Sequence, residues 1–264
     1  MTAQPPSPPA AVDWHDWLAR WERMQAGHLH DRRGRVEVVL EACTLQDAGP
    51  DLAILELGCG PGGILVALAR RHPSARLVGV DHDPLLLAIA RETAGRRAGT
   101  QLVDGDLRRS DWVERLRRAL GLDGGPAFDA VVSSTALHWL EPDQLRAAYA
   151  GAHRLLRPGG VLLNADRMEF GDAGLDRLAQ VAREGGEAEA AEPETWSAWW
   201  SAIAGVPELA QLRAERDRRF PAVDHAHGHH STESDHRRAL LAAGFGRVEK
   251  LWAWYDSAVL CALR

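Results

Sequence analysis

The stretch Ile54-Leu-Glu-Leu-Gly58-Cys-Gly60-Pro-Gly62-Gly63 decides the fold of this 264-residue chain. It starts within a short apolar run, residues 52–57, of the kind that forms a strand buried on both faces of a parallel sheet. Glycines follow, and beyond them Ile64, Leu65 and Leu68 recur at helical spacing. A buried strand that turns through glycine into a helix lets the backbone approach a ligand closely.

The same alternation of strand and helix continues on the C-terminal side. Strands are predicted at 52–57, 77–80, 100–103, 128–133 and 161–165, and helices between them at 64–71, 84–94, 112–120 and 145–156. The last of these helices is expected to stop at Arg157-Pro158-Gly159-Gly160. A helix at 235–243 and an antiparallel pair of strands at 247–254 and 257–263 close the chain. This order predicts an α/β fold, a Rossmann-like doubly wound sheet that is mostly parallel with an antiparallel C-terminal strand.

We expect a single domain over residues 13–264, preceded by a disordered, proline-rich tail at 1–12. Within the domain, residues 13–50 form N-terminal helices, 51–166 the ligand-binding core, 172–235 a cap insertion, and 236–264 the last helix and the strand pair. Segment 172–235 is distinct because it holds 13 acidic and 6 basic residues. Its tryptophans at 196, 199 and 200 recur at helical spacing, so it contains at least one helix.

The composition excludes several classes of protein. The chain has 31 basic and 37 acidic residues and no dense basic block, so nucleic acid is not an expected partner. Three scattered cysteines, at 43, 59 and 261, suit neither a disulfide framework nor a zinc site and favour a cytoplasmic location. There is no signal peptide pattern and no run of 18 apolar residues, so no membrane association is expected. Histidines at 225, 227, 229 and 230 form a local cluster, which we interpret as a loop or lid segment rather than a metal site.

Residues in and beside the glycine turn indicate the charge of the ligand that it binds. Gly58, Gly60 and Gly63 satisfy the dinucleotide pattern G-x-G-x-x-G, and Asp81 follows 18 residues later, where it can bind ribose hydroxyls. Glu56, however, places a carboxylate where a pyrophosphate would be repelled and an ammonium group attracted. Pro61 also removes a backbone donor that a phosphate would use. The pattern therefore favours a cationic ligand over NAD.

Four pieces of the sequence together resemble the class I S-adenosylmethionine-dependent methyltransferases. They are ILELGCGPGG at 54–63, VGVDHDP at 78–84, VDGDL at 103–107 and FDAVVSSTALHWL at 128–140, which is followed by LLRPGG at 155–160. The last of the four, with the tryptophan-rich N-terminal helix, is similar to trans-aconitate and malonyl-carrier-protein methyltransferases and to bacterial tailoring enzymes. Those relatives usually carry Asn where Ser134 stands.

The resemblance implies S-adenosyl-L-methionine as cofactor and S-adenosyl-L-homocysteine as product. Glu56 would face the amino group, Asp81 would bind both ribose hydroxyls, and Asp106 with the Leu107 amide would bind adenine. The implied cofactor-binding residues are Glu56, Gly58, Cys59, Gly60, Asp81, His82, Asp106, Leu107, Ser133 and Ser134.

One histidine and several tryptophans are the candidates for the part of the site that binds the acceptor. His138 follows the fourth strand and is the best candidate for a general base, although a structural role is open. Other candidates are His28, His30 and Tyr255, and Arg32 and Arg33 can attract an acceptor carboxylate. The resemblance places an aromatic wall around the acceptor, to which we assign Trp17, Trp21, Trp139, Trp199 and Trp200.

We therefore predict a bacterial enzyme, a monomer or homodimer, that methylates an oxygen or nitrogen of a small molecule. Three alternatives stay open. The first is a cyclase, pericyclase or decarboxylase that uses the same fold and cofactor without methyl transfer. The others are an NAD-dependent oxidoreductase and a non-catalytic partner that binds the cofactor and stabilises another subunit.

Overall fold

The computed structural model describes residues 12–45, 51–185, 194–220 and 231–264. Residues 1–11 of the predicted tail and the histidine cluster at 225–230 lie outside the described residues. The division into one domain with a core and a cap remains a prediction.

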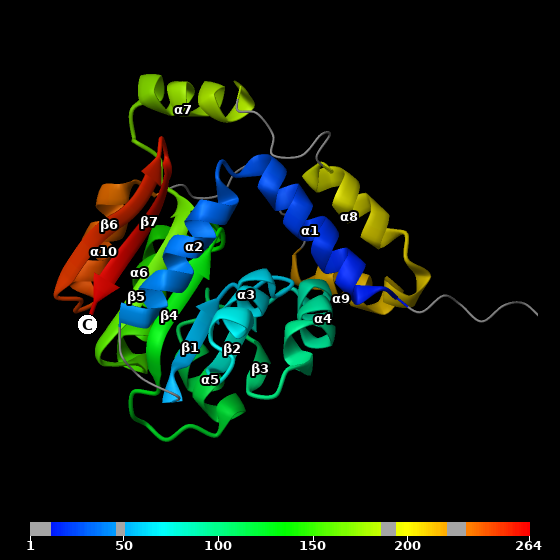
Figure 1. Cartoon of the computed structure of the whole chain (residues 1–264), viewed down its shortest axis with the longest axis horizontal. Coiled ribbons are helices and arrows are strands. Elements are labelled where there is room, and N and C mark those ends of the chain that lie inside the picture. The colour runs from blue at the N-terminus through cyan, green and yellow to red at the C-terminus, as the bar shows by residue number, and fades with distance from the viewer. Residues whose placement is uncertain (1–11, 46–50, 186–193, 221–230) are drawn as a thin grey trace, which may run out of the picture.

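The described residues form a sheet with strand order β3-β2-β1-β4-β5-β7-β6 (Figure 1). The strands are β1 (Ala53–Leu57), β2 (Arg76–Asp81), β3 (Thr100–Asp104), β4 (Phe128–Ser134), β5 (Leu156–Arg167), β6 (Arg247–Trp254) and β7 (Ser257–Leu263). β1 to β5 run parallel, whereas β7 pairs antiparallel with both β5 and β6. The predicted Rossmann-like doubly wound sheet is confirmed, and its parallel strands end at one common edge.

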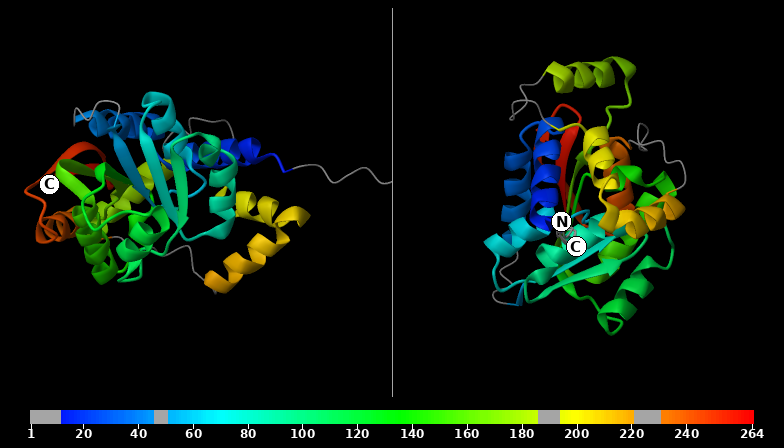
Figure 2. Two further views of the ribbon diagram at one scale, coloured as in Figure 1. Left: turned by 90° about the horizontal axis from the view of Figure 1, so that it is seen from below. Right: turned by 90° about the vertical axis from the view of Figure 1, so that its right-hand side faces the viewer.

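Helices cover both faces of the sheet (Figure 1 and Figure 2). One face packs against α2 (Arg32–Ala42) and α3 (Gly63–Arg71), and the other against α5 (Trp112–Leu120), α6 (Pro142–Leu155) and α10 (Glu233–Ala242). β1 shows why the run at 52–57 is mostly apolar. Ile54 packs in the core on the α2 and α3 face, and Leu55 and Leu57 pack in the core on the α5, α6 and α10 face; all three are fully buried. Because both faces are covered, no residue of that strand can be polar without a special reason.

A third cluster joins the N-terminal helix to the cap. α1 (Trp14–His28), α4 (Pro84–Glu92), α8 (Trp196–Ala204) and α9 (Ala210–Arg219) lie together at one side of the molecule, where Trp17, Trp21 and Trp199 pack with Leu85 and Ile89. α7 (Ala173–Gly185) lies beyond the tips of β6 and β7 (Figure 1). Short 3-10 helices complete the described structure: η1 (Cys43–Leu45), η3 (Ala94–Arg96), η4 (Leu137–Trp139) and η5 (Pro207–Leu209).

One predicted boundary is wrong. Arg157-Pro158-Gly159-Gly160 was expected to separate the helix from the strand, but β5 begins at Leu156, directly after α6 ends. Leu156 already pairs with Phe128, and the register then shifts, so the glycines form an irregularity inside the strand pair. The Arg157 guanidinium holds this segment on β4 through Asp129 at 2.8 Å. The helix thus ends before this segment as expected, but the strand begins earlier than predicted, with Arg157 paired to Asp129 of β4.

Candidate active site

A cavity of about 530 Å³ opens at the carboxyl ends of the parallel strands, with α1, α8 and α9 among the elements around it. The predicted site residues that line it are Glu56, Gly58, Cys59, Gly60, Asp81, His82, Asp106, Leu107, Ser134, His138, Trp21, Trp139 and Trp200. His28 and Arg32 also line it, whereas His30, Arg33 and Tyr255 do not. Residues that are far apart in the sequence meet here because parallel strands place their C-termini at one edge.

Ser133, Trp17 and Trp199 are the predicted site residues that do not line the cavity. Ser133 is buried between strands, and its hydroxyl donates to the Leu57 carbonyl at 2.8 Å. The rings of Trp17 and Trp199 pack edge to face, with centroids 5.6 Å apart, in the cluster formed by α1, α4, α8 and α9. Their bulk supports the cavity, but their rings do not face it.

The turn after β1 requires glycine for steric reasons. Gly58 has φ +68°, and a Cβ placed on it would lie 2.3 Å from the Cβ of Ala136. The Asp81 carboxylate anchors this turn, since one oxygen accepts from Gly60 N–H at 2.7 Å. The other oxygen accepts from the amides of His82 and Asp83 at 2.7 and 2.8 Å. Asp81 thus ties the glycine turn to the end of β2 and still has lone pairs for a ligand.

Glu56 is a buried carboxylate at the base of the cavity, 2% exposed, and its Oε2 has no hydrogen-bond partner among the described residues. Burial raises its pKa well above the usual value, and the charges of Asp81 and Glu22 raise it further. A buried carboxylate oxygen without a hydrogen bond is costly unless a ligand pairs with it. The geometry therefore fits a cationic group at this position.

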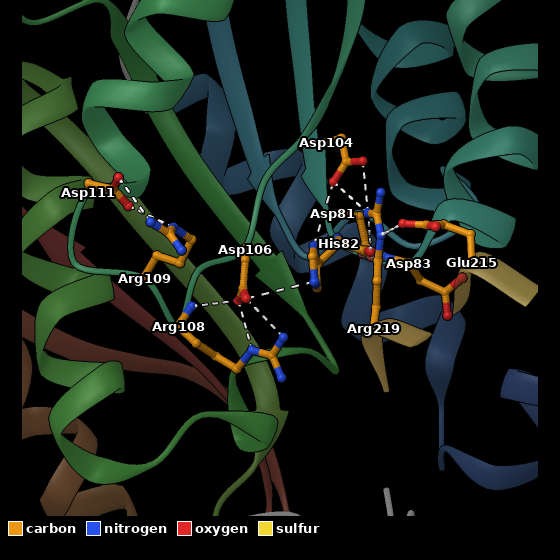
Figure 3. Close-up of polar contacts among 10 residues, drawn as sticks. All are labelled: Asp81, His82, Asp83, Asp104, Asp106, Arg108, Arg109, Asp111, Glu215 and Arg219. Carbon is orange, nitrogen blue, oxygen red and sulfur yellow. Dashed lines mark hydrogen bonds and ion pairs between the residues drawn. The ribbon is translucent and has the colours of Figure 1, made fainter. Parts of the chain in front are cut away.

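Charged side chains of β2, β3 and the following loop define the other end of the cavity (Figure 3). Arg108 makes two hydrogen bonds of 2.8 Å to the Asp106 carboxylate. Burial alone would raise the pKa of Asp106, but the bonds from Arg108 outweigh it and lower the pKa. His82 lies between Asp104 and Asp106, at 3.6 and 3.7 Å from their oxygens. Asp106 is consequently an ionised acceptor beside an imidazole.

His138 belongs to a pair that sequence reasoning missed. Its Nδ1 lies 2.7 Å from Asp166 Oδ1, and its backbone N–H donates to Oδ2 at 3.1 Å. Asp166 is fully buried near the end of β5. Burial would raise the pKa of Asp166, but His138 and Arg35 lower it to about 2. The carboxylate is therefore ionised and fixes the orientation of the imidazole.

Arg35 was also missed. It is 1% exposed on α2, where it donates to the Ala165 carbonyl at 2.6 Å and to Ser257 Oγ at 2.9 Å. Burial lowers the pKa of this guanidinium to about 10, and the Asp166 charge opposes that shift. An acid near the end of the fifth strand was a usable signal for Asp166. An arginine in a helix carried none.

The aromatic wall consists of Trp21, Trp139, Trp196 and Trp200. The rings of Trp21 and Trp196 lie 5.3 Å apart, and those of Trp196 and Trp200 lie 5.7 Å apart. The Arg216 guanidinium, also in the lining, stacks 3.9 Å from the Trp200 ring. This wall combines apolar ring faces with a cation, which suits a flat acceptor.

The described residues hold no group of three or more His, Cys, Asp or Glu side chains arranged to bind a metal ion. Within the same ranges, every helix is too short or too polar to cross a bilayer.

Residues 54–160 match the model of the methyltransferase domain family. The carboxy-S-adenosyl-L-methionine synthase of Chromohalobacter salexigens is 32% identical over 124 residues, which are 45% of this chain and 41% of that protein. The trans-aconitate 2-methyltransferase of Rhodococcus jostii is 37% identical over 120 residues, 46% of this chain and 40% of that protein. The chain thus matches about two-fifths of the length of these curated relatives.

A solved structure shows the same fold. The magnesium protoporphyrin IX methyltransferase from Synechocystis PCC 6803, with bound SAH, superposes with a TM-score of 0.54 and 18% identity over 94% of each chain. The matched domain includes the glycine turn after β1, and the sheet carries the antiparallel C-terminal strand, β7, that the sequence predicted. The matched domain model and the relatives relate residues 54–160 to the class I S-adenosylmethionine-dependent methyltransferases, and the fold agrees with that relation.

Proposed function

We propose that the protein catalyses methyl transfer from S-adenosyl-L-methionine to an oxygen or nitrogen of a small-molecule acceptor. The observation that carries the proposal is the buried Glu56 carboxylate at the glycine turn, whose Oε2 has no hydrogen-bond partner among the described residues and calls for a cation. The cofactor, when bound, supplies a methyl group already activated by the sulfonium. The protein then has to position the acceptor and exclude water, and positioning alone contributes roughly 7–11 kcal/mol.

The cofactor would be held along the strand ends. Glu56 would bind the amino group, with the backbone of Gly58, Cys59, Gly60, Ser133 and Ser134 around the methionine part. Asp81 would accept from the ribose hydroxyls. Asp106 and the Leu107 amide would bind adenine, with His82 beside it. These roles are supported by the shared lining of one cavity, from which Ser133 alone of this set is set back.

The acceptor would lie against Trp21, Trp139 and Trp200, within reach of His138. Because Asp166 occupies Nδ1 of His138, the proton taken from an acceptor would go to Nε2. A phenol, alcohol or protonated amine would benefit from such a base, whereas a carboxylate would not need one. Trp17 and Trp199 would act by supporting the wall.

We propose a bacterial, cytoplasmic enzyme, monomeric or homodimeric, that acts on small molecules. The lack of a dense basic block supports a small-molecule acceptor rather than nucleic acid. The relatives and the fold do not favour an NAD-dependent oxidoreductase or a non-methylating enzyme on this fold. The mass of the product separates methyl transfer from the latter.

Isothermal titration calorimetry with S-adenosyl-L-methionine tests cofactor binding. We expect Asp81→Asn to weaken binding about tenfold or more, because a charged acceptor is lost. Asp111→Asn is the matched control, since Asp111 is an exposed carboxylate paired with Arg109 and Arg115 outside the cavity. Absence of binding by the wild type would refute the proposal. Labelled cofactor with a panel of phenols, amines and carboxylic acids would then identify the acceptor.

A further inference from the structure

The cap helix α9 reaches the nucleoside end of the cavity. Phe220, which ends α9, lines the same cavity as Asp81 and Asp106. The Phe220 ring lies 5.5 Å from the His82 ring. The Arg108 guanidinium lies 5.7 Å from the Phe220 ring, and all three side chains line the cavity. The predicted cap segment 172–235 therefore contributes an aromatic ring where adenine would bind.

Two arginines of α9 hold the helix on the strand ends. Arg219 donates to the Asp104 carboxylate at 2.8 Å and to the His82 carbonyl at 3.0 Å (Figure 3). Arg216 donates to Asp83 Oδ2 at 2.6 Å, and this pair is largely buried. The two contacts join residues 115 and 133 positions apart in the sequence, so they restrain the cap against the core.

The contact at Asp83 is connected to the ribose-binding carboxylate. The other oxygen of Asp83 accepts from the first amides of α4, and its own N–H donates to Asp81. Arg216 also stacks on Trp200, so one side chain contacts both the acceptor wall and the nucleoside end. A change in the position of α9 would therefore alter contacts at both ends of the cavity, with Trp200 at one end and Asp83 at the other.

We infer that α9 is a clasp on the cofactor site: Arg216 and Arg219 fasten it to Asp83 and Asp104, and Phe220 forms one side of the adenine slot. This inference rests on the proposed function. S-adenosyl-L-methionine would then enter, and S-adenosyl-L-homocysteine would leave, after these ion pairs break. The Arg219–Asp104 pair is partly exposed and is screened by salt, whereas the buried Arg216–Asp83 pair is screened much less. Exchange should therefore quicken as ionic strength rises, mainly through the Arg219 pair.

Stopped-flow tryptophan fluorescence, with Trp200 in the cavity wall as reporter, measures dissociation of S-adenosyl-L-homocysteine. We expect Arg216→Ala and Arg219→Ala each to raise the dissociation rate about tenfold, the effect of a charged hydrogen bond, and Arg219→Ala also to flatten its salt dependence. Phe220→Ala should raise the rate and leave the salt dependence intact. Arg218→Ala is the matched control, because Arg218 is 69% exposed and pairs with Glu215 of the same helix.

Rates within twofold of the wild type for all three variants would overturn the clasp. A wild type that binds no cofactor would instead refute the proposed function. To separate the clasp from a loss of folding, Asp104→Arg combined with Arg219→Asp should restore slow dissociation relative to either single variant. Failure of this exchange to restore it, with both chains folded by circular dichroism, would also count against the clasp.

Discussion

Replacement of Glu56 by glutamine tests the electrostatic basis of cofactor binding. The carboxyl is 2% exposed, and burial followed by the charges of Asp81 and Glu22 raises its pKa, while Arg32 lowers it. Burial therefore favours the protonated form of Glu56 in the free protein. An ammonium group of the cofactor stabilises the carboxylate, so we expect binding to release a proton, up to one per site.

The direction of the pH dependence follows. Affinity should rise with pH, by at most a factor of ten per unit, between the pKa of Glu56 in the complex and its pKa in the free protein. The rise should end at about pH 8, where an α-amino group begins to lose its own proton. Stability changes the opposite way: a raised pKa means that the contribution of Glu56 to folding is present at low pH and is lost as pH rises through the folded-state pKa.

The magnitude comes from one charge-assisted hydrogen bond, about 1.5–3 kcal/mol, so Glu56→Gln should weaken binding roughly ten- to hundredfold. The variant should also unfold at a higher temperature than the wild type at alkaline pH. Titration calorimetry in two buffers of different ionisation enthalpy counts the released protons. Glu37→Gln, at a half-exposed surface position, is the control. Equal enthalpies in both buffers together with wild-type affinity of Glu56→Gln would show that the reasoning is wrong.

Three further predictions concern the core of the site. Asp166→Asn should lower the free energy of unfolding by about 3–5 kcal/mol in urea titrations, because it leaves a buried guanidinium without its counter-charge. In the wild type, the stabilisation by Asp166 should be present above pH 4 and be lost as pH falls towards its pKa of about 2. His138→Gln should reduce kcat about 10²–10⁴-fold for a phenol or alcohol acceptor while cofactor Kd stays constant, and an unchanged kcat would exclude a base. Trp199→Ala should cost about 3–5 kcal/mol of unfolding free energy, since the ring is fully buried, and a loss below 1 kcal/mol would contradict its structural role.

Much of the architecture was readable from local pattern. The strands around the glycine turn, α5 and the closing strand pair lie at or within a residue or two of the predicted bounds. These elements have strong signals: buried apolar runs, helical spacing and glycine turns. At Arg157-Pro158-Gly159-Gly160 the helix ends as predicted, but the strand start was placed too late, because the pairing of Leu156 with Phe128 is a long-range contact that no local window contains.

At the site, the sequence by itself determined which side chains end the parallel strands, and hence the positions of Glu56, Asp81 and Asp106. Only the tertiary structure decided their partners. Arg35 beside Asp166, and α9 on Asp83 and Asp104, come from segments whose local sequence is that of ordinary exposed helices. The physical reason is that strand periodicity is a property of neighbouring residues, whereas charge pairing is decided by which distant surfaces pack together.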